Sequence, residues 1–309
     1  MEVFFTVGSQ VLIMLILVSV GFFLYKFGKL KDSTIGDLTW LLLNVIIPCL
    51  IFSSFASVES GTISPISLIM AVVCAFLSIF SAIVVSKFLF KKEPIERQKV
   101  LRFSVIFSNA AFMGLPLVTS VLSDSAIIFA SFYIAVFNFL TFTYGYNLMS
   151  SDKNVNKLKV LVNPGTIGIA LGLPIYLLNI NLPEIILAPI QSLEGLNTPI
   201  AMIIIGTYIA KMKLNDFVND KAVYVACLYR LILVPILILG IFMLINPGDE
   251  LLLSTLIQGS APTAATTALF AISYNGDAKL ASKTVAISTI LSLITLPLIM
   301  VLATFLINL

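Results

Sequence analysis

Histidine is absent from this sequence of 309 residues, and charged residues of any kind are scarce. Charged side chains make up 11 % of the chain and hydrophobic ones 59 %, and the mean hydropathy is +1.10. Without histidine, the commonest metal ligand and general base of proteins is missing. The three cysteines, Cys49, Cys74 and Cys227, have a spacing that suits neither a metal site nor a loop disulfide. We therefore expect buried free thiols and no metal, cofactor or catalytic residue.

Long apolar runs fill most of the chain. A bilayer core about 30 Å thick needs roughly 20 apolar residues per helix, and the connecting segments are too short to fold as a soluble domain. The sequence predicts an all-α membrane protein with ten membrane-spanning helices, at residues 6–26, 38–57, 66–90, 98–121, 126–149, 163–180, 185–210, 219–245, 251–273 and 282–307.

Basic residues gather on one side of these predicted helices. Seventeen of the eighteen Lys and Arg residues fall near alternate loops, and Arg230 is the exception. Cytoplasmic loops retain Lys and Arg, so both termini are predicted to lie on the extracytoplasmic face of a cell membrane. The net charge of +3 reflects this asymmetry and does not indicate a nucleic-acid partner. The compact chain with short loops suggests a prokaryotic protein.

The two halves of the chain resemble each other when the sequence is shifted by 151 residues. Gly21 then meets Gly172, Tyr25 meets Tyr176, and the predicted spans coincide. Five helices per half is an odd number, so the second half must enter the membrane from the opposite side. Inverted repeats are typical of secondary transporters, although an old duplication could also leave such symmetry without transport. The expected division is a first repeat at 1–150, a short cytoplasmic linker at 151–162 and an inverted repeat at 163–309.

Polar residues, glycines and prolines interrupt the fourth and ninth predicted helices at matching places. Proline lacks an amide hydrogen and frees backbone groups that lipid cannot satisfy. Half-helix ends at mid-membrane would then expose N–H groups that attract anions. We expect the helix breaks at Gly114, Pro116, Gly259 and Pro262, and we expect a carboxylate to be bound by Asn109, Ser260 and Thr263. The alternative for each residue is a simple kink or a hydroxyl bonded to its own helix.

The second and seventh predicted helices carry another symmetric pair. Asn44 with Pro48 and Asn197 with Pro199 are further candidates for substrate binding and helix breaks, or are packing kinks. Arg230 and Glu194 are ionisable residues within predicted spans, which are costly there and suggest a function in charge pairing or coupling. Arg230 could instead extend its stem towards the cytoplasm, and Glu194 could lie in an irregular helix start.

Several stretches resemble the auxin efflux carrier family, which includes the plant PIN auxin exporters and bacterial malate permeases. They are "NVIIPCLIFSSFA", "SNAAFMGLPL", "NPGTIG", "NTPIAMIIIG", "SAPTAATTALFAISYNGD" and "ASKTVAISTILSLITLPL", in that order along nearly the whole chain. The resemblance implies a fold like that of sodium/proton antiporters and bile-acid symporters, with helices 4 and 9 crossing. It also implies a scaffold of helices 1, 2, 6 and 7, a transport domain of helices 3–5 and 8–10, and elevator-type alternating access.

By position, Asn109 matches the family's crossover Asn that binds the substrate carboxylate, and Pro116 and Pro262 match its crossover prolines. The expected function is secondary transport of a small organic anion such as an auxin-like or dicarboxylic acid, and only the family name favours export. The expected partners are membrane lipids and a second copy of the chain in a homodimer. A sodium- or proton-coupled symporter of the bile-acid type is the alternative. Two weaker alternatives are a non-transporting sensor and an intramembrane protease, the latter because "YNGD" at 274–277 loosely resembles a protease motif.

Overall fold

The computed structural model describes residues 2–57, 63–150, 164–211, 220–274 and 276–307, and these ranges are helical apart from short connections and one isolated two-residue bridge. The first half contains α1 (Glu2–Lys26), α2 (Asp32–Leu41), α3 (Ile47–Ser57), α4 (Pro65–Ser86), α5 (Ile95–Ile106), α6 (Leu115–Val121), α7 (Asp124–Leu140) and α8 (Tyr146–Met149). The second half contains α10 (Pro164–Leu177), α11 (Glu184–Glu194), α12 (Asn197–Ala210), α13 (Lys221–Leu228), α14 (Val234–Ile245), α15 (Asp249–Ser260), α16 (Thr266–Ser273) and α17 (Ala278–Ile307).

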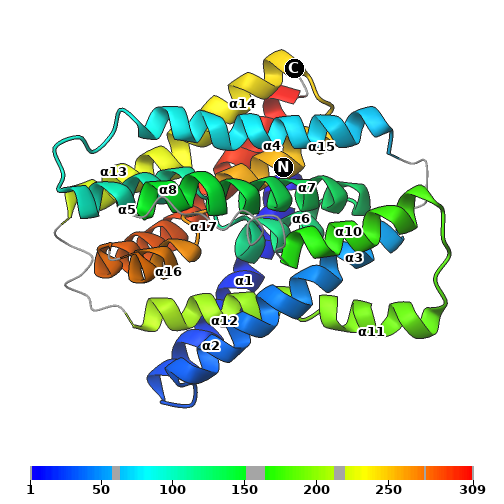
Figure 1. Ribbon diagram of the computed structural model, residues 1–309, viewed down its shortest axis with the longest axis horizontal. Coiled ribbons are helices and arrows are strands. Elements are labelled where there is room, and N and C mark those ends of the chain that lie inside the picture. The colour runs from blue at the N-terminus through cyan, green and yellow to red at the C-terminus, as the bar shows by residue number, and fades with distance from the viewer. Residues whose placement is uncertain (1, 58–62, 151–163, 212–219, 275, 308–309) are drawn as a thin grey trace.

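Six helical stretches within the described residues are long and apolar enough to cross a bilayer. They are residues Asp32–Ser53, Pro65–Ser86, Ser125–Met149, Glu184–Ala210, Lys221–Ile245 and Ala278–Ile307. Each of the ten predicted spans overlaps a helical stretch, so the all-helical expectation is confirmed. The count of ten spans and the repeat remain predictions, and the expected linker at 151–162 falls outside the described residues. In Figure 1 most helices run across the view, with α4 and α14 in the upper part and α11, α12 and α2 in the lower part.

Short π-helical turns precede prolines inside three helical stretches of the molecule. The turns η1 (Leu42–Ile46), η2 (Ala110–Gly114) and η5 (Tyr229–Leu233) are each followed, two residues later, by a proline: Pro48, Pro116 and Pro235. Proline removes one backbone donor and clashes with the carbonyl four residues before it. The wider π turn accommodates the clash while the helix continues. A fourth turn, η3 (Thr141–Gly145), has no proline after it.

Glycines allow two helix pairs to approach closely. A Cβ atom on Gly21 of α1 would overlap the carbonyl of Ile203 in α12, and one on Gly206 of α12 would overlap the carbonyl of Val18 in α1. On the other pair, a Cβ on Gly172 of α10 would come within 3.2 Å of the Cα of Phe52 in α3. Small residues at such contacts are typical of helix packing in membranes, where close backbone approach replaces the hydrophobic effect.

The cysteines are free thiols, as expected. Cys74 and Cys227 are buried, whereas Cys49 is half-buried.

Candidate functional site

Two interrupted helical stretches meet at their interruptions. The chain leaves α5 after Ile106 and resumes helix at Ala110, and it leaves α15 after Ser260 and resumes at Thr266. Ser108 and Thr263 form an antiparallel bridge between the interruptions. We call the residues 107–109 and 261–265 the crossover. In Figure 1, α5 and α16 lie on the left of the molecule, with α6 nearer its centre.

Each interruption supplies the hydrogen-bond partners that the other lacks. The Asn109 amide N–H donates to the Pro262 carbonyl at 2.6 Å, and the Ala264 N–H donates to the Phe107 carbonyl at 2.9 Å. The Thr263 N–H donates to the Ser288 hydroxyl on α17 at 3.1 Å. Irregular backbone at membrane depth is tolerated only where protein satisfies it. The crossover is therefore held by its own pairing and by α17.

The position of the break corrects one expectation. Gly114 and Pro116 do not open the fourth stretch, because the chain is already out of helical conformation at residues 107–109. The N–H of Gly114 donates to the carbonyl of Asn109, five residues earlier, at 3.0 Å. This π-type bond lets the helix continue past Pro116, which lies inside α6. In the ninth stretch Pro262 does lie in the break, whereas Gly259 is still within α15.

The sequence left open whether the Arg230 side chain stays inside the protein or extends towards the cytoplasm. Its side chain is 1 % exposed, and its Nη1 donates to the carbonyls of Val105 at 2.9 Å and Ile106 at 3.1 Å. These are the last carbonyls of α5, where the helix dipole is negative. Arg230 thus caps α5 beside the crossover and does not extend to the cytoplasm. Its Nε and Nη2 are buried without a hydrogen-bond partner.

The predicted substrate ligands at the crossover are all buried, but their partners differ. Asn109 is 4 % exposed, and its Nδ2 has no hydrogen-bond partner. The Ser260 hydroxyl is likewise buried and unpartnered. Thr263, in contrast, donates its hydroxyl to the Ser104 carbonyl at 3.2 Å. Asn109 and Ser260 therefore keep free polar atoms, whereas Thr263 holds the crossover to α5.

The two asparagines of the second symmetric pair, Asn44 and Asn197, have different environments in the structure. Asn44 is exposed and donates its side-chain amide to the Trp40 carbonyl of its own helical stretch at 2.8 Å, which is the packing alternative. Asn197 is buried, with its Oδ1 unpartnered, at the first residue of α12. Pro199 lies in the first turn of α12, where a proline breaks no helical bond. Pro48 follows a π turn, so it does not interrupt the stretch either.

Glu194 ends α11, just before the interruption at Gly195 and Leu196 that separates α11 from α12. It is half-buried and lies close enough to Cys49 of α3 to interact with it electrostatically. The irregular start expected for this stretch has Pro183 as the residue before α11 and Pro189 inside it.

Gln258 and Tyr133 are buried neighbours of the crossover that the sequence did not single out as ligands. The Gln258 Nε2 donates to the Ala130 carbonyl at 3.2 Å, while its Oε1 has no partner and lies where a Cβ on Gly114 would be. The Tyr133 hydroxyl lies 3.4 Å from the Ser108 hydroxyl. No periodic signal could find these contacts, because they join residues on different helices.

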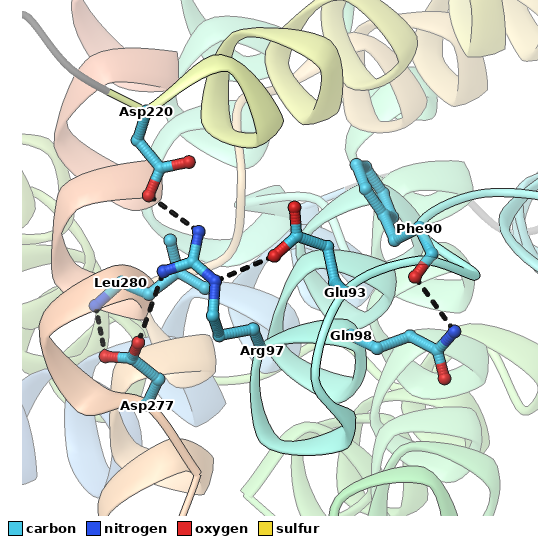
Figure 2. A network of polar contacts seen from close by, with 7 residues as sticks. All are labelled: Phe90, Glu93, Arg97, Gln98, Asp220, Asp277 and Leu280. Carbon is cyan, nitrogen blue, oxygen red and sulfur yellow. Dashed lines mark hydrogen bonds and ion pairs between the residues drawn. The ribbon is translucent and has the colours of Figure 1, made fainter.

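An ion cluster at the start of α5 was also not predicted. Arg97 pairs with Glu93 at 2.9 Å, with Asp220 at 2.7 Å and with Asp277 at 3.6 Å, and Asp277 also accepts the N–H of Leu280 in α17 (Figure 2). Hydrogen bonds that Arg97 donates to the carboxylates of Asp220 and Glu93 raise its pKa above the ordinary value, so Arg97 stays charged. Asp277, from the protease-like "YNGD", thus has a structural role.

Comparison with known proteins identifies the family of this chain. The family described as "Membrane transport protein" matches residues 6–158 and 153–300. The chain belongs to this family. The resemblance to auxin efflux carriers is confirmed, and the chain is a multi-pass membrane protein of a transporter family. An uncharacterized transporter of Methanothermobacter thermautotrophicus is 27 % identical over 302 residues, covering 94 % of this chain and 96 % of the relative. An uncharacterized transporter of Methanocaldococcus jannaschii is 26 % identical over 302 residues, covering 93 % of this chain and 96 % of the relative.

Proposed function

We propose that this member of the membrane transport protein family is a secondary transporter of a small organic anion, with the substrate carboxylate bound at the crossover. The observation that carries the proposal is the buried charge of Arg230. Among the described residues, none of the ion pairs includes Arg230, and none of the Asp and Glu side chains whose burial the structure describes is buried. A buried cation without a counter-ion is costly. An anionic substrate would supply the missing negative charge.

Unpartnered donors around the crossover support the same chemistry. The Nδ2 of Asn109, the hydroxyl of Ser260 and the free Nε and Nη2 of Arg230 are all buried without partners. Helix α16 also begins at the crossover, and the N-terminal ends of helices attract anions. Hydrogen bonds from these donors to a carboxylate would be charge-assisted and strong. Asn197, with a free buried Oδ1, is a further candidate for the polar part of the substrate.

Transport would use the inverted-repeat architecture, with 1–150 and 163–309 as the repeats and 151–162 as the linker. The glycine contacts support this proposal. Gly21 packs on Ile203, and Gly172 packs on Phe52. A shift of 151 residues brings Gly21 onto Gly172 and Phe52 onto Ile203, so the two contacts are equivalent in the two halves. We propose ten helices, of which helices 1, 2, 6 and 7 form a scaffold and the others a transport domain that moves as an elevator. The basic loops favour a cell membrane with both termini extracytoplasmic, and a homodimer is proposed from the family alone.

Coupling to sodium, as in bile-acid symporters, is a second candidate because oxygen atoms near the crossover are also unpartnered. They are the Oε1 of Gln258 and the hydroxyl oxygens of Thr266 and Thr267. Oxygen ligands of this kind suit hard cations. Replacing sodium by potassium or choline in a transport assay separates the two candidates, since only the coupled carrier loses uptake.

The purified protein in liposomes tests the main proposal. Radiolabelled dicarboxylates, amino-acid-derived acids and indole acetate are supplied with and without pH and sodium gradients, and the compound that moves is taken into binding assays. Asn109→Ala should weaken its binding by about tenfold or more, because a hydrogen bond to a charged group is lost.

Asn44→Ala is the matched control, since Asn44 bonds only to its own helical stretch. The control should bind like the unaltered protein. Equal affinity of the Asn109 variant and the unaltered protein would contradict the site, and liposomes that move none of these anions would contradict the function.

A further inference from the structure

A half-open groove lies where α17 meets α1 and α12. It has a volume of about 310 Å³ and is lined by Leu15, Val18, Ser19, Phe22 and Phe23 of α1, Ile209 of α12, and Thr289, Ile290 and Leu293 of α17. Along α1 these residues extend over about 12 Å at the helical rise of 1.5 Å per residue. The groove is thus an elongated slot inside the apolar part of the molecule.

The groove offers no free hydrogen-bond donor to an occupant. Its two polar side chains are used within their own helices: the Ser19 hydroxyl donates to the Leu15 carbonyl at 2.8 Å, and the Thr289 hydroxyl donates to the Val285 carbonyl at 2.8 Å. A polar or charged ligand would lose its hydration here without compensation. The groove therefore accepts only an apolar chain, and about ten methylene groups fit if each takes roughly the volume of a water molecule, about 30 Å³.

The mouth of the groove opens onto the lipid-facing surface. Phe23 is 54 % exposed and Ile290 is 37 % exposed, and their neighbours Ile16 and Ile294 are exposed apolar residues. In a bilayer, acyl chains cover such a surface, so an acyl chain is the apolar chain that reaches the mouth.

Two lysines flank the groove along the helices that line it. The Nζ of Lys26 on α1 is 5.7 Å from the ring centroid of Phe22, which lines the groove. On α17, Lys283 precedes Ile290 by seven residues, which places it on the same face about 10 Å nearer the start of the helix. Within the described ranges, neither lysine forms an ion pair, whereas Lys211, whose Nζ lies over the ring of Tyr25 on α1, is paired with Asp32 at 2.7 Å.

We propose that this groove binds one acyl chain of an anionic phospholipid, with the lipid phosphate held by Lys26 and Lys283. The apolar slot and the two free cations match the two parts of such a lipid, and basic residues beside membrane helices attract anionic head groups. The site is separate from the crossover and does not depend on transport. The lipid lies between α1 and α12 on one side and α17 on the other.

Native mass spectrometry of the full-length protein tests the site, with phosphatidylglycerol and phosphatidylcholine of identical acyl chains as probes. We expect the anionic lipid to bind more tightly. Lys26→Gln and Lys283→Gln should each weaken its binding about fivefold, while Lys221→Gln, an exposed lysine of α13, should have no effect. Equal binding of the two lipids, or unchanged binding in both groove-lysine variants, would overturn the proposal.

The apolar part is tested by filling the groove. Leu293→Trp should abolish the tight binding, whereas Ile294→Trp, the adjacent lipid-facing position, should retain it. Photocrosslinking of the unaltered protein with a phosphatidylglycerol that carries a diazirine in its acyl chain gives a second measurement if the Leu293 variant does not fold. The label should attach to residues 15–23 and 289–293, and labelling elsewhere alone would refute the site.

Discussion

Arg230 illustrates at the scale of a single residue how a costly group becomes useful. The guanidinium joins η5 to the end of α5 through two carbonyls that have no helical partner of their own. It satisfies these carbonyls and leaves a positive charge at the end of α5, three residues before Asn109 in the sequence. The hydrogen bonds and the charge are two separate contributions, and substitutions can distinguish them.

Two variants of Arg230 separate its charge from its hydrogen bonds. Arg230→Lys keeps the charge on a shorter stem, and Arg230→Gln keeps an N–H donor of neutral charge. If the charge attracts the substrate anion, the Gln variant should bind the transported anion at least about tenfold more weakly than the Lys variant. Equilibrium binding in detergent measures this difference. Equal losses in both variants would mean that Arg230 only caps α5.

At the scale of elements, the helices were predictable from the sequence and their interruptions only in part. Apolar runs of about 20 residues determine where helices form in a membrane protein. Pro116 is absorbed by a π turn, and the break lies at residues 107–109, where the chain pairs with Pro262 and Ala264. A proline in the sequence therefore indicates a weakened helix, but the neighbouring chain decides where the backbone leaves it.

The contact between α1 and α12 gives a prediction at the same scale. Gly206→Ala adds a methyl group against the Val18 carbonyl, so the helices must move apart. Such overpacking costs about 1–3 kcal/mol, and the midpoint of thermal unfolding in detergent should fall by several degrees.

Gly36→Ala in α2 is the control, because no atom lies within 4 Å of the added Cβ. It should be neutral or slightly stabilising, as expected for Gly to Ala within a helix. A Gly206 variant as stable as the unaltered protein would show that the close contact does not stabilise the fold.

At the scale of the whole molecule, the Arg97 cluster joins three regions that are far apart in the sequence. Glu93 and Arg97 come from the connection before α5 and its start, Asp220 precedes α13, and Asp277 precedes α17 (Figure 2). All three helices belong to the proposed transport domain. The cluster would hold their ends together when this domain moves.

Removing the central cation should loosen these helix ends. Arg97→Gln leaves three neighbouring carboxylates without their counter-charge, and the midpoint of thermal unfolding should fall by roughly 2–4 °C. The loss should shrink in high salt, because the groups are partly exposed and screened. Lys92→Gln, an exposed neighbour, is the control. A midpoint that is the same in both variants at low salt would contradict a stabilising cluster.

The sequence by itself determined that this is a helical membrane protein, where most of its helices lie and which family it belongs to. These properties are local, because apolar segments are read along the chain and motifs keep their order. Only the tertiary structure decided the partners of the candidate site. Arg230 meets carbonyls 124 and 125 residues away, Asn109 pairs with Pro262, and the groove is shared by three helices. Hydrogen bonds and packing between distant segments depend on how the helices are arranged, which no periodicity in the sequence specifies.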